Sequence, residues 1–148
     1  MDSDDVDTVF LAGASGDTGQ HVLRLLAKRN VRVRALTRSP AKRDRLRRAG
    51  ADEVVVDNLL DPTTLVSAVD GADAVISAVG SAPADILDSG PYVDGAGIRN
   101  LIAAAVEGGI EAFVMESAIG VGEQNASALA EVFDLVIGPI QRAKAETE

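Results

Sequence analysis

Residues Asp7–Gly19 read DTVFLAGASGDTG, a short apolar run that leads at once into three glycines. The run Asp7–Ala12 has the β-branched and aromatic composition of a strand. The stretch Asp17–Asn30 that follows the glycines carries apolar residues at helical spacing. The segment therefore predicts a strand that passes through a tight turn directly into a helix.

The glycine turn has the chemistry of a phosphate site, because a helix N-terminus offers unpaired N–H donors and a positive dipole end. We expect Gly13 to allow a sharp turn, Gly16 to let backbone approach a pyrophosphate, and Gly19 to let the helix lie close to the sheet. Hydroxyls within the turn can add donors. The candidate dinucleotide-binding residues here are Gly13, Ser15, Gly16, Asp17, Thr18 and Gly19. The alternative is a turn kept glycine-rich for packing alone. The absence of Gly-Lys-Ser/Thr argues against a nucleoside-triphosphate P-loop.

The rest of the chain continues to alternate strand-like and helix-like segments. Further strands are expected at Val31–Thr37, Glu53–Asp57, Ala74–Val79 and Ile110–Met115, and helices at Pro40–Gly50, Pro62–Val69 and Tyr92–Glu107. This alternation is typical of an α/β fold with a doubly wound parallel sheet, Rossmann-like, in three αβα layers. Later, Asn125–Ile137 is read as a helix or a ligand-covering loop, and Pro139–Glu148 as the start of another helix.

Composition fits one domain over residues 1–148 and excludes several classes of function. The chain has no cysteine and one histidine, so thiol chemistry is excluded and a metal cluster is not expected. No apolar run is long enough to span a membrane, and the acidic N-terminus suggests a cytoplasmic protein. Net charge is −9, but 11 of the 14 basic residues lie in residues 24–48. We expect poor nucleic-acid binding overall, with a local capacity to hold a small anion.

The turn spacing G-x-x-G-x-x-G in GASGDTG resembles the atypical and extended short-chain dehydrogenases/reductases, especially the NmrA-like and NAD(P)-binding epimerase-like group. The resemblance continues through ALTRSP at 35–40, GADAVI at 71–76, VDGAGIRNLIAAA at 93–105 and FVMES at 113–117. It implies a dinucleotide cofactor and a single cofactor-binding domain. Family members continue further, so the C-terminal part looks shortened and the substrate side largely absent. An open sheet edge could then favour a homodimer.

The end of the second strand bears on the choice of cofactor. In dinucleotide folds an acid there holds the ribose 2′-hydroxyl of NAD, whereas an arginine accommodates the 2′-phosphate of NADP. This chain has Arg38 at that place, with Lys42 and Arg43 one turn on. We therefore expect NADP(H) to be preferred over NAD(H). The alternative, a solvated basic face, suits the arginines at 45, 47 and 48 better than Arg38.

The resemblance also implies contacts beyond the glycine turn. The family has Gly-Asp-Leu after strand three, and its Asp faces the adenine amino group. Here Asn58 fills the Asp position before Leu59 and can still bond the adenine edge through its amide. The segment Ala78, Val79 and Gly80 after strand four matches the segment that lines the adenine ribose and the nicotinamide side.

Catalytic members of the superfamily use Ser/Thr, Tyr and Lys, with tyrosine as the general acid/base. By resemblance, Ser117 matches the serine and Lys144 the lysine, which also holds the nicotinamide ribose. The tyrosine should lie one helical turn before the lysine, where this chain has Ile140. Tyr92, the one tyrosine, lies outside the motif and is expected to pack or to line the cleft.

Two further polar residues have plainer interpretations. Glu116 replaces the first serine of the family pair, as an alternative acid/base or as a solvated carboxylate at a strand end. His21 is expected to be a packing or surface residue.

The sequence leaves two main functions open: an NADP(H)-dependent oxidoreductase without the usual tyrosine, or a non-catalytic NADP(H) redox sensor that acts through a protein partner. A fragment that binds nothing is a third interpretation.

Overall fold

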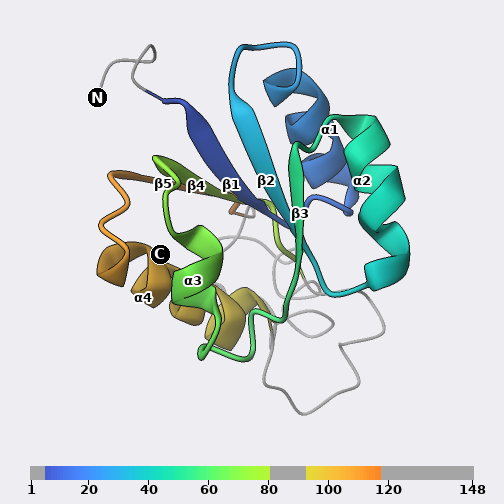
Figure 1. The fold of residues 1–148 in the computed structure, drawn as a ribbon. Helices are drawn as coiled ribbons and strands as arrows, with labels where there is room; N and C mark the ends of the chain where they lie inside the picture. Colours follow the sequence, from blue (N-terminus) through green and yellow to red (C-terminus); the bar gives the residue numbers. More distant parts are fainter. Residues whose placement is uncertain (1–5, 81–92, 118–148) are drawn as a thin grey trace, which may run out of the picture.

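The computed structural model describes residues 6–80 and 93–117, which form a five-stranded parallel sheet with helices on both faces (Figure 1). The strands are β1 (Thr8–Ala12), β2 (Arg32–Thr37), β3 (Glu53–Val56), β4 (Ala74–Ser77) and β5 (Ala112–Met115). Their spatial order is β3-β2-β1-β4-β5, and every neighbouring pair is parallel. This order confirms the doubly wound, Rossmann-like α/β fold.

The helices divide into two layers. Helices α1 (Asp17–Leu26) and α2 (Arg43–Ala49) cover one face of the sheet, and α3 (Leu65–Val69) and α4 (Ile98–Glu107) cover the other (Figure 1). A 3₁₀ turn, η2 (Pro40–Lys42), precedes α2, and a π-helical turn, η4 (Val93–Gly97), precedes α4. The observed arrangement is the three-layer αβα architecture expected from the alternation of elements.

The central strand β1 supplies both hydrophobic cores. Side chains alternate across a strand, so neighbouring residues point to opposite faces. Phe10 packs with Leu101 of α4 in one core, and Leu11 packs with Leu23 of α1 in the other. Phe10 and Leu11 are each 0% exposed. The uninterrupted apolar run of β1 is thus explained by a sheet covered on both sides.

Several element boundaries differ from the predicted ones. The first helix ends at Leu26 rather than Asn30, because the N–H groups of Lys28 and Arg29 bond the carbonyls three residues back, in tight turns. The segment predicted as one helix at Pro40–Gly50 is divided between η2 and α2. The last two predicted segments, 125–137 and 139–148, lie outside the described residues.

The helix predicted at Pro62–Val69 is also shorter, since α3 begins at Leu65. Asp61, the residue before the predicted helix, caps the turn that precedes α3. Its Oδ1 accepts from the backbone N–H and the hydroxyl of Thr63, at 3.1 and 2.7 Å. The Thr63 hydroxyl and N–H hold the pKa of the Asp61 carboxyl below its ordinary value. Other predicted boundaries shift: Tyr92–Glu107 becomes η4 and α4 from Val93, and strands β4 and β5 are Ala74–Ser77 and Ala112–Met115.

Two carboxylates tie the amino ends of neighbouring strands together. Asp73, just before β4, accepts from the backbone N–H groups of Asp7 and Thr8 at 2.9 and 2.8 Å. Asp52, just before β3, accepts from the N–H of Val33 at 2.8 Å. These bonds satisfy backbone donors at the edge of the sheet opposite the glycine turn. Asp73, the acidic residue of the GADAVI motif, therefore has a structural role.

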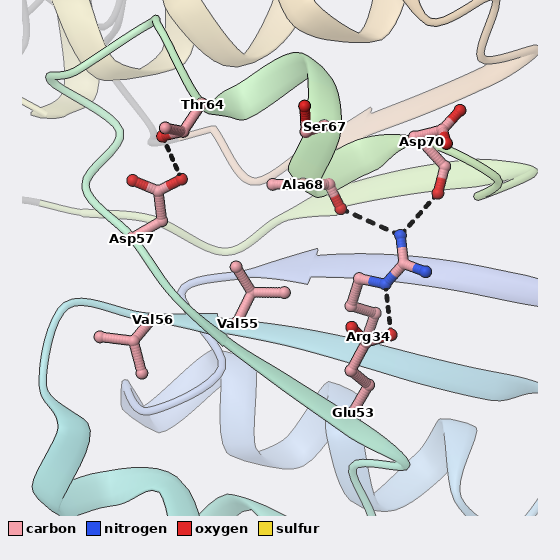
Figure 2. A pocket seen from close by; sticks show the side chains of 9 residues that line it. All are labelled: Arg34, Glu53, Val55, Val56, Asp57, Thr64, Ser67, Ala68 and Asp70. Carbon is pink, nitrogen blue, oxygen red and sulfur yellow. Dashed lines mark hydrogen bonds and ion pairs between the residues drawn. The ribbon is translucent and has the colours of Figure 1, made fainter.

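A hollow of about 470 Å³ lies between β3 and α3, and its polar groups bond one another (Figure 2). Arg34, whose side chain is 20% exposed, pairs through Nε with Oε2 of Glu53 at 2.7 Å. One terminal nitrogen donates to the carbonyls of Ala68 and Asp70, at 3.0 and 2.6 Å. Carbonyls at a helix C-terminus lack intrahelical donors. Arg34 therefore holds the end of α3 against the sheet.

We predict that Arg34→Met lowers the free energy of unfolding by about 1–3 kcal/mol, because hydrogen bonds from a charged donor to partly buried carbonyls are lost. Arg32→Met is the matched control: Arg32 lies two residues earlier on the same strand and is exposed. Its effect should stay within about 0.5 kcal/mol. Urea denaturation of both variants measures the difference, and equal stabilities would contradict the role of Arg34.

Candidate functional site

A cleft of about 300 Å³ opens at the carboxyl ends of β1, β2, β3 and β4. Its described lining consists of Gly13, Ser15, Gly16, Leu36, Thr37, Arg38, Lys42, Asn58, Leu59, Ala78, Val79, Gly80 and Val93. Strands β1 and β4 lie side by side here. Helix α1, which follows β1, covers one face of the sheet, whereas α4 covers the other (Figure 1). Such a switch point is where open α/β sheets bind their ligands.

The glycine turn brings three backbone segments into close contact. Gly13 has φ +79°, a left-handed conformation that favours glycine. A Cβ on Gly13 would overlap the carbonyl oxygen of Ala78, and one on Gly19 would overlap that of Gly13. The turn closes with a hydrogen bond from the N–H of Gly16 to the carbonyl of Gly13, at 3.0 Å. The roles predicted for Gly13 and Gly19 match this geometry.

The start of α1 leaves donors available to a ligand. The first N–H groups of an α-helix have no acceptor within the helix. At α1 the N-cap is Gly16, which has no side chain to accept them, and Gly16 itself is exposed on the cleft wall. Backbone donors and the positive end of the helix dipole therefore face the same side as the cleft. This is a suitable cradle for a phosphate group.

The side chains of the lining carry positive charge and no negative charge. Arg38 is exposed at the end of β2. Lys42 lies at the end of η2, and its Nζ donates to Oγ of Ser15 at 3.4 Å. Lys42 thus reaches from the α2 side across to the glycine turn. Among the residues that the structure describes, two cations and no carboxylate line this cleft, in a chain whose net charge is −9.

The far end of the cleft is more apolar. Leu59 is buried there, and the amide of Asn100 on α4 donates to its carbonyl at 2.8 Å. Asn58, beside it, is exposed, and its Oδ1 accepts from the N–H of Leu60 at 3.0 Å. The NLIAAA motif of α4 therefore holds the loop that follows β3 in place.

Some predicted site residues lie near the cleft without lining it. Asp17, Thr18 and Gly19 are in the first turn of α1 but are not among the lining residues. The Thr18 hydroxyl donates to Oε1 of Glu116 at 3.1 Å, which joins α1 to the segment after β5. Ser117 follows directly and is exposed, outside the described lining.

His21 is exposed on α1, with Nδ1 at 3.1 Å from the carbonyl of Asp17. This agrees with its interpretation as a surface residue. Tyr92, Ile140 and Lys144 lie outside the described residues. Sequence reasoning missed Leu36, Thr37 and Val93 as lining residues. The family motif that begins at Val93 marked the segment but gave no role for its side chain.

Two negative findings concern the described part of the chain. Residues 6–80 and 93–117 contain no helix long and apolar enough to cross a membrane. Within the same ranges, no three acidic or histidine side chains gather as a metal site would require.

Comparison with known proteins agrees with this geometry. A family model described as NAD(P)H-binding matches residues 13–148. The chloroplastic protein TIC 62 of rice (Oryza sativa subsp. japonica) is 31% identical over 132 residues, 77% of this chain and 27% of that protein. Sanguinarine reductase of Eschscholzia californica is 40% identical over 78 residues, 51% of this chain and 28% of that protein. The chain thus spans little more than a quarter of the length of these two relatives.

Among solved structures, a protein of Bacillus halodurans assigned to the NAD-dependent epimerases/dehydratases superposes with a TM-score of 0.75. It is 26% identical, and the match covers 95% of this chain and 62% of that one. The family match includes the glycine turn and the whole of the described cleft. The chain therefore belongs to the NAD(P)H-binding family, as its resemblance to the atypical short-chain dehydrogenases/reductases predicts.

Proposed function

We propose that this chain binds NADP(H) in the cleft between the glycine turn and the ends of β2, β3 and β4. The observation that carries the proposal is the charge of the described lining: it includes Arg38 and Lys42, and none of its members within residues 6–80 and 93–117 is a carboxylate. A 2′-phosphate is a dianion that pairs well with a guanidinium and an ammonium. The 2′-hydroxyl of NAD would instead need an acceptor, and the end of β2 offers no acidic one.

Different residues of the cleft would bind different parts of the dinucleotide. The turn Gly13–Gly16 and the start of α1 would take the pyrophosphate. Arg38 would take the 2′-phosphate, with Lys42 between it and the turn. Because the protein as a whole is acidic, such a polyanion needs a local positive potential to approach. The cations of the cleft and the N-terminus of α1 supply that potential together.

The bound nicotinamide supplies hydride transfer in family enzymes. Proton transfer would have to come from the chain itself. By resemblance, Ser117 would orient a substrate oxygen, but Ile140 stands where the proton-donating tyrosine is expected and carries no transferable proton. We therefore propose binding without turnover, as in a redox-sensing module that signals to a protein partner.

An oxidoreductase is the second candidate. Ser117 is retained after β5, Lys144 is retained in the sequence, and one relative is named as a reductase. The two candidates share the cofactor site and differ in whether Ser117 and Lys144 act on a substrate.

We predict that NADPH binds at least tenfold more tightly than NADH, as expected for charge-assisted bonds to a phosphate worth about 1.5–3 kcal/mol. Arg38→Ala should remove most of this difference by weakening NADPH and leaving NADH nearly unchanged. Isothermal titration calorimetry with both nucleotides measures the four affinities.

Arg48→Ala is the control for overall charge, since Arg48 is exposed on α2 and outside the lining. It should leave the ratio of the two affinities within about twofold of wild type, because an exposed charge that does not line the cleft is screened by water and salt. Equal affinities for NADPH and NADH in the wild-type chain would refute the preference.

We predict no oxidation of NADPH by generic carbonyl or quinone substrates, because the position of the usual proton donor is Ile140. The measurement is the loss of NADPH absorbance with time at saturating nucleotide. Turnover that disappears in Ser117→Ala would show that the chain is an enzyme and would favour the second candidate.

A further inference from the structure

The loop after β3 presents one polar side chain, Asn58, at the apolar end of the cleft. Three hydrogen bonds fix this residue. Its N–H donates to Oδ1 of Asp57 at 2.7 Å, its carbonyl accepts from the N–H of Asp61 at 2.9 Å, and its Oδ1 accepts from the N–H of Leu60 at 3.0 Å. Two of these bonds hold the backbone of Asn58, and the third orients its side chain.

The hydrogen bond from Leu60 also distinguishes the oxygen of the Asn58 side-chain amide from its nitrogen. A backbone N–H can only donate, so the atom that faces it must be the oxygen of Asn58 and not the nitrogen. The nitrogen, Nδ2, occupies the other branch. No described residue accepts a hydrogen bond from it, so the loop offers two N–H donors at the cleft.

The base of the dinucleotide would lie at this end of the cleft, and the inference rests on the proposed function in that respect. The turn takes the pyrophosphate and Arg38 takes the ribose phosphate. The remaining lining near Asn58 includes the apolar side chains of Leu36, Leu59 and Val79. Apolar walls suit the faces of a flat purine, and a side chain beside them can bond its edge.

We propose that Asn58 makes the base site tolerant of 6-oxopurines. An aspartate at this place offers only acceptors, which suit the 6-amino group of adenine and oppose a 6-oxo group. The Asn58 amide offers donors instead. Nδ2 can donate to a ring nitrogen of adenine or to the 6-oxo oxygen of hypoxanthine, and Oδ1 keeps a second lone pair for the amino group. The site should therefore accept either base.

The test compares NADPH with its hypoxanthine analogue, deamino-NADPH, by calorimetry on the full chain. In the wild type we expect the two dissociation constants to agree within about threefold, since the Asn58 amide can form neutral hydrogen bonds with either base. In Asn58→Asp the analogue should weaken at least fivefold relative to NADPH, because two acceptors then face each other. The aspartate can still accept from the N–H of Leu60, so the loop should keep its conformation.

Asn30→Asp is the matched control, with the same change of charge at an exposed position in the loop between α1 and β2, away from the cleft lining. It should leave the ratio of the two dissociation constants unchanged.

Asn58→Ala provides a second measurement if the aspartate variant does not fold: it should weaken the binding of both nucleotides by a similar factor. The proposal is overturned if the wild type rejects the analogue, if Asn58→Asp leaves the ratio unchanged, or if Asn58→Ala leaves both affinities unchanged. Failure of NADPH itself to bind would overturn the proposed function instead, which keeps the two failures distinct.

Discussion

The close contact of three backbone segments at the carboxyl end of β1 is the constraint on which both the fold and the site depend. Gly13, Gly19 and Ala78 come so near one another that no Cβ fits at either glycine. Only with this contact can α1 begin directly after β1 and lie against the sheet beside the end of β4. The same contact places the N-terminus of α1 beside the cleft, which Gly16 lines. Packing and phosphate binding are therefore two results of one geometric requirement.

The basic residues between positions 24 and 48 have different roles in the fold. Arg34 is turned toward α3 and bonds two carbonyls near the helix end. Arg38 and Lys42 line the cleft, where an anion would meet them. Arg47 and Arg48 on α2 are exposed. Position relative to the sheet, rather than charge alone, thus decides which cations can contribute to binding.

Local sequence was sufficient for the doubly wound parallel sheet and for the glycine turn, because the alternation of strands and helices and the spacing of the glycines are short-range patterns. It was insufficient for the end of α1, where Lys28 and Arg29 form tight turns that compete with helix at almost equal cost. Contacts between residues far apart in the sequence also could not be predicted from local patterns. The bond between Thr18 and Glu116 joins residues 98 positions apart, and it exists only because β5 ends beside the start of α1.

The binding part and the reactive part of this architecture come from different stretches of the chain. The described lining of the cleft comes from residues between Gly13 and Val93. The residues that would carry chemistry come later: Ser117 follows the edge strand β5, and Ile140 and Lys144 follow it in sequence. A change at the tyrosine position therefore need not disturb the glycine turn, Arg38 or the loop at Asn58. The proposed loss of proton transfer is therefore compatible with the cleft that the described residues form.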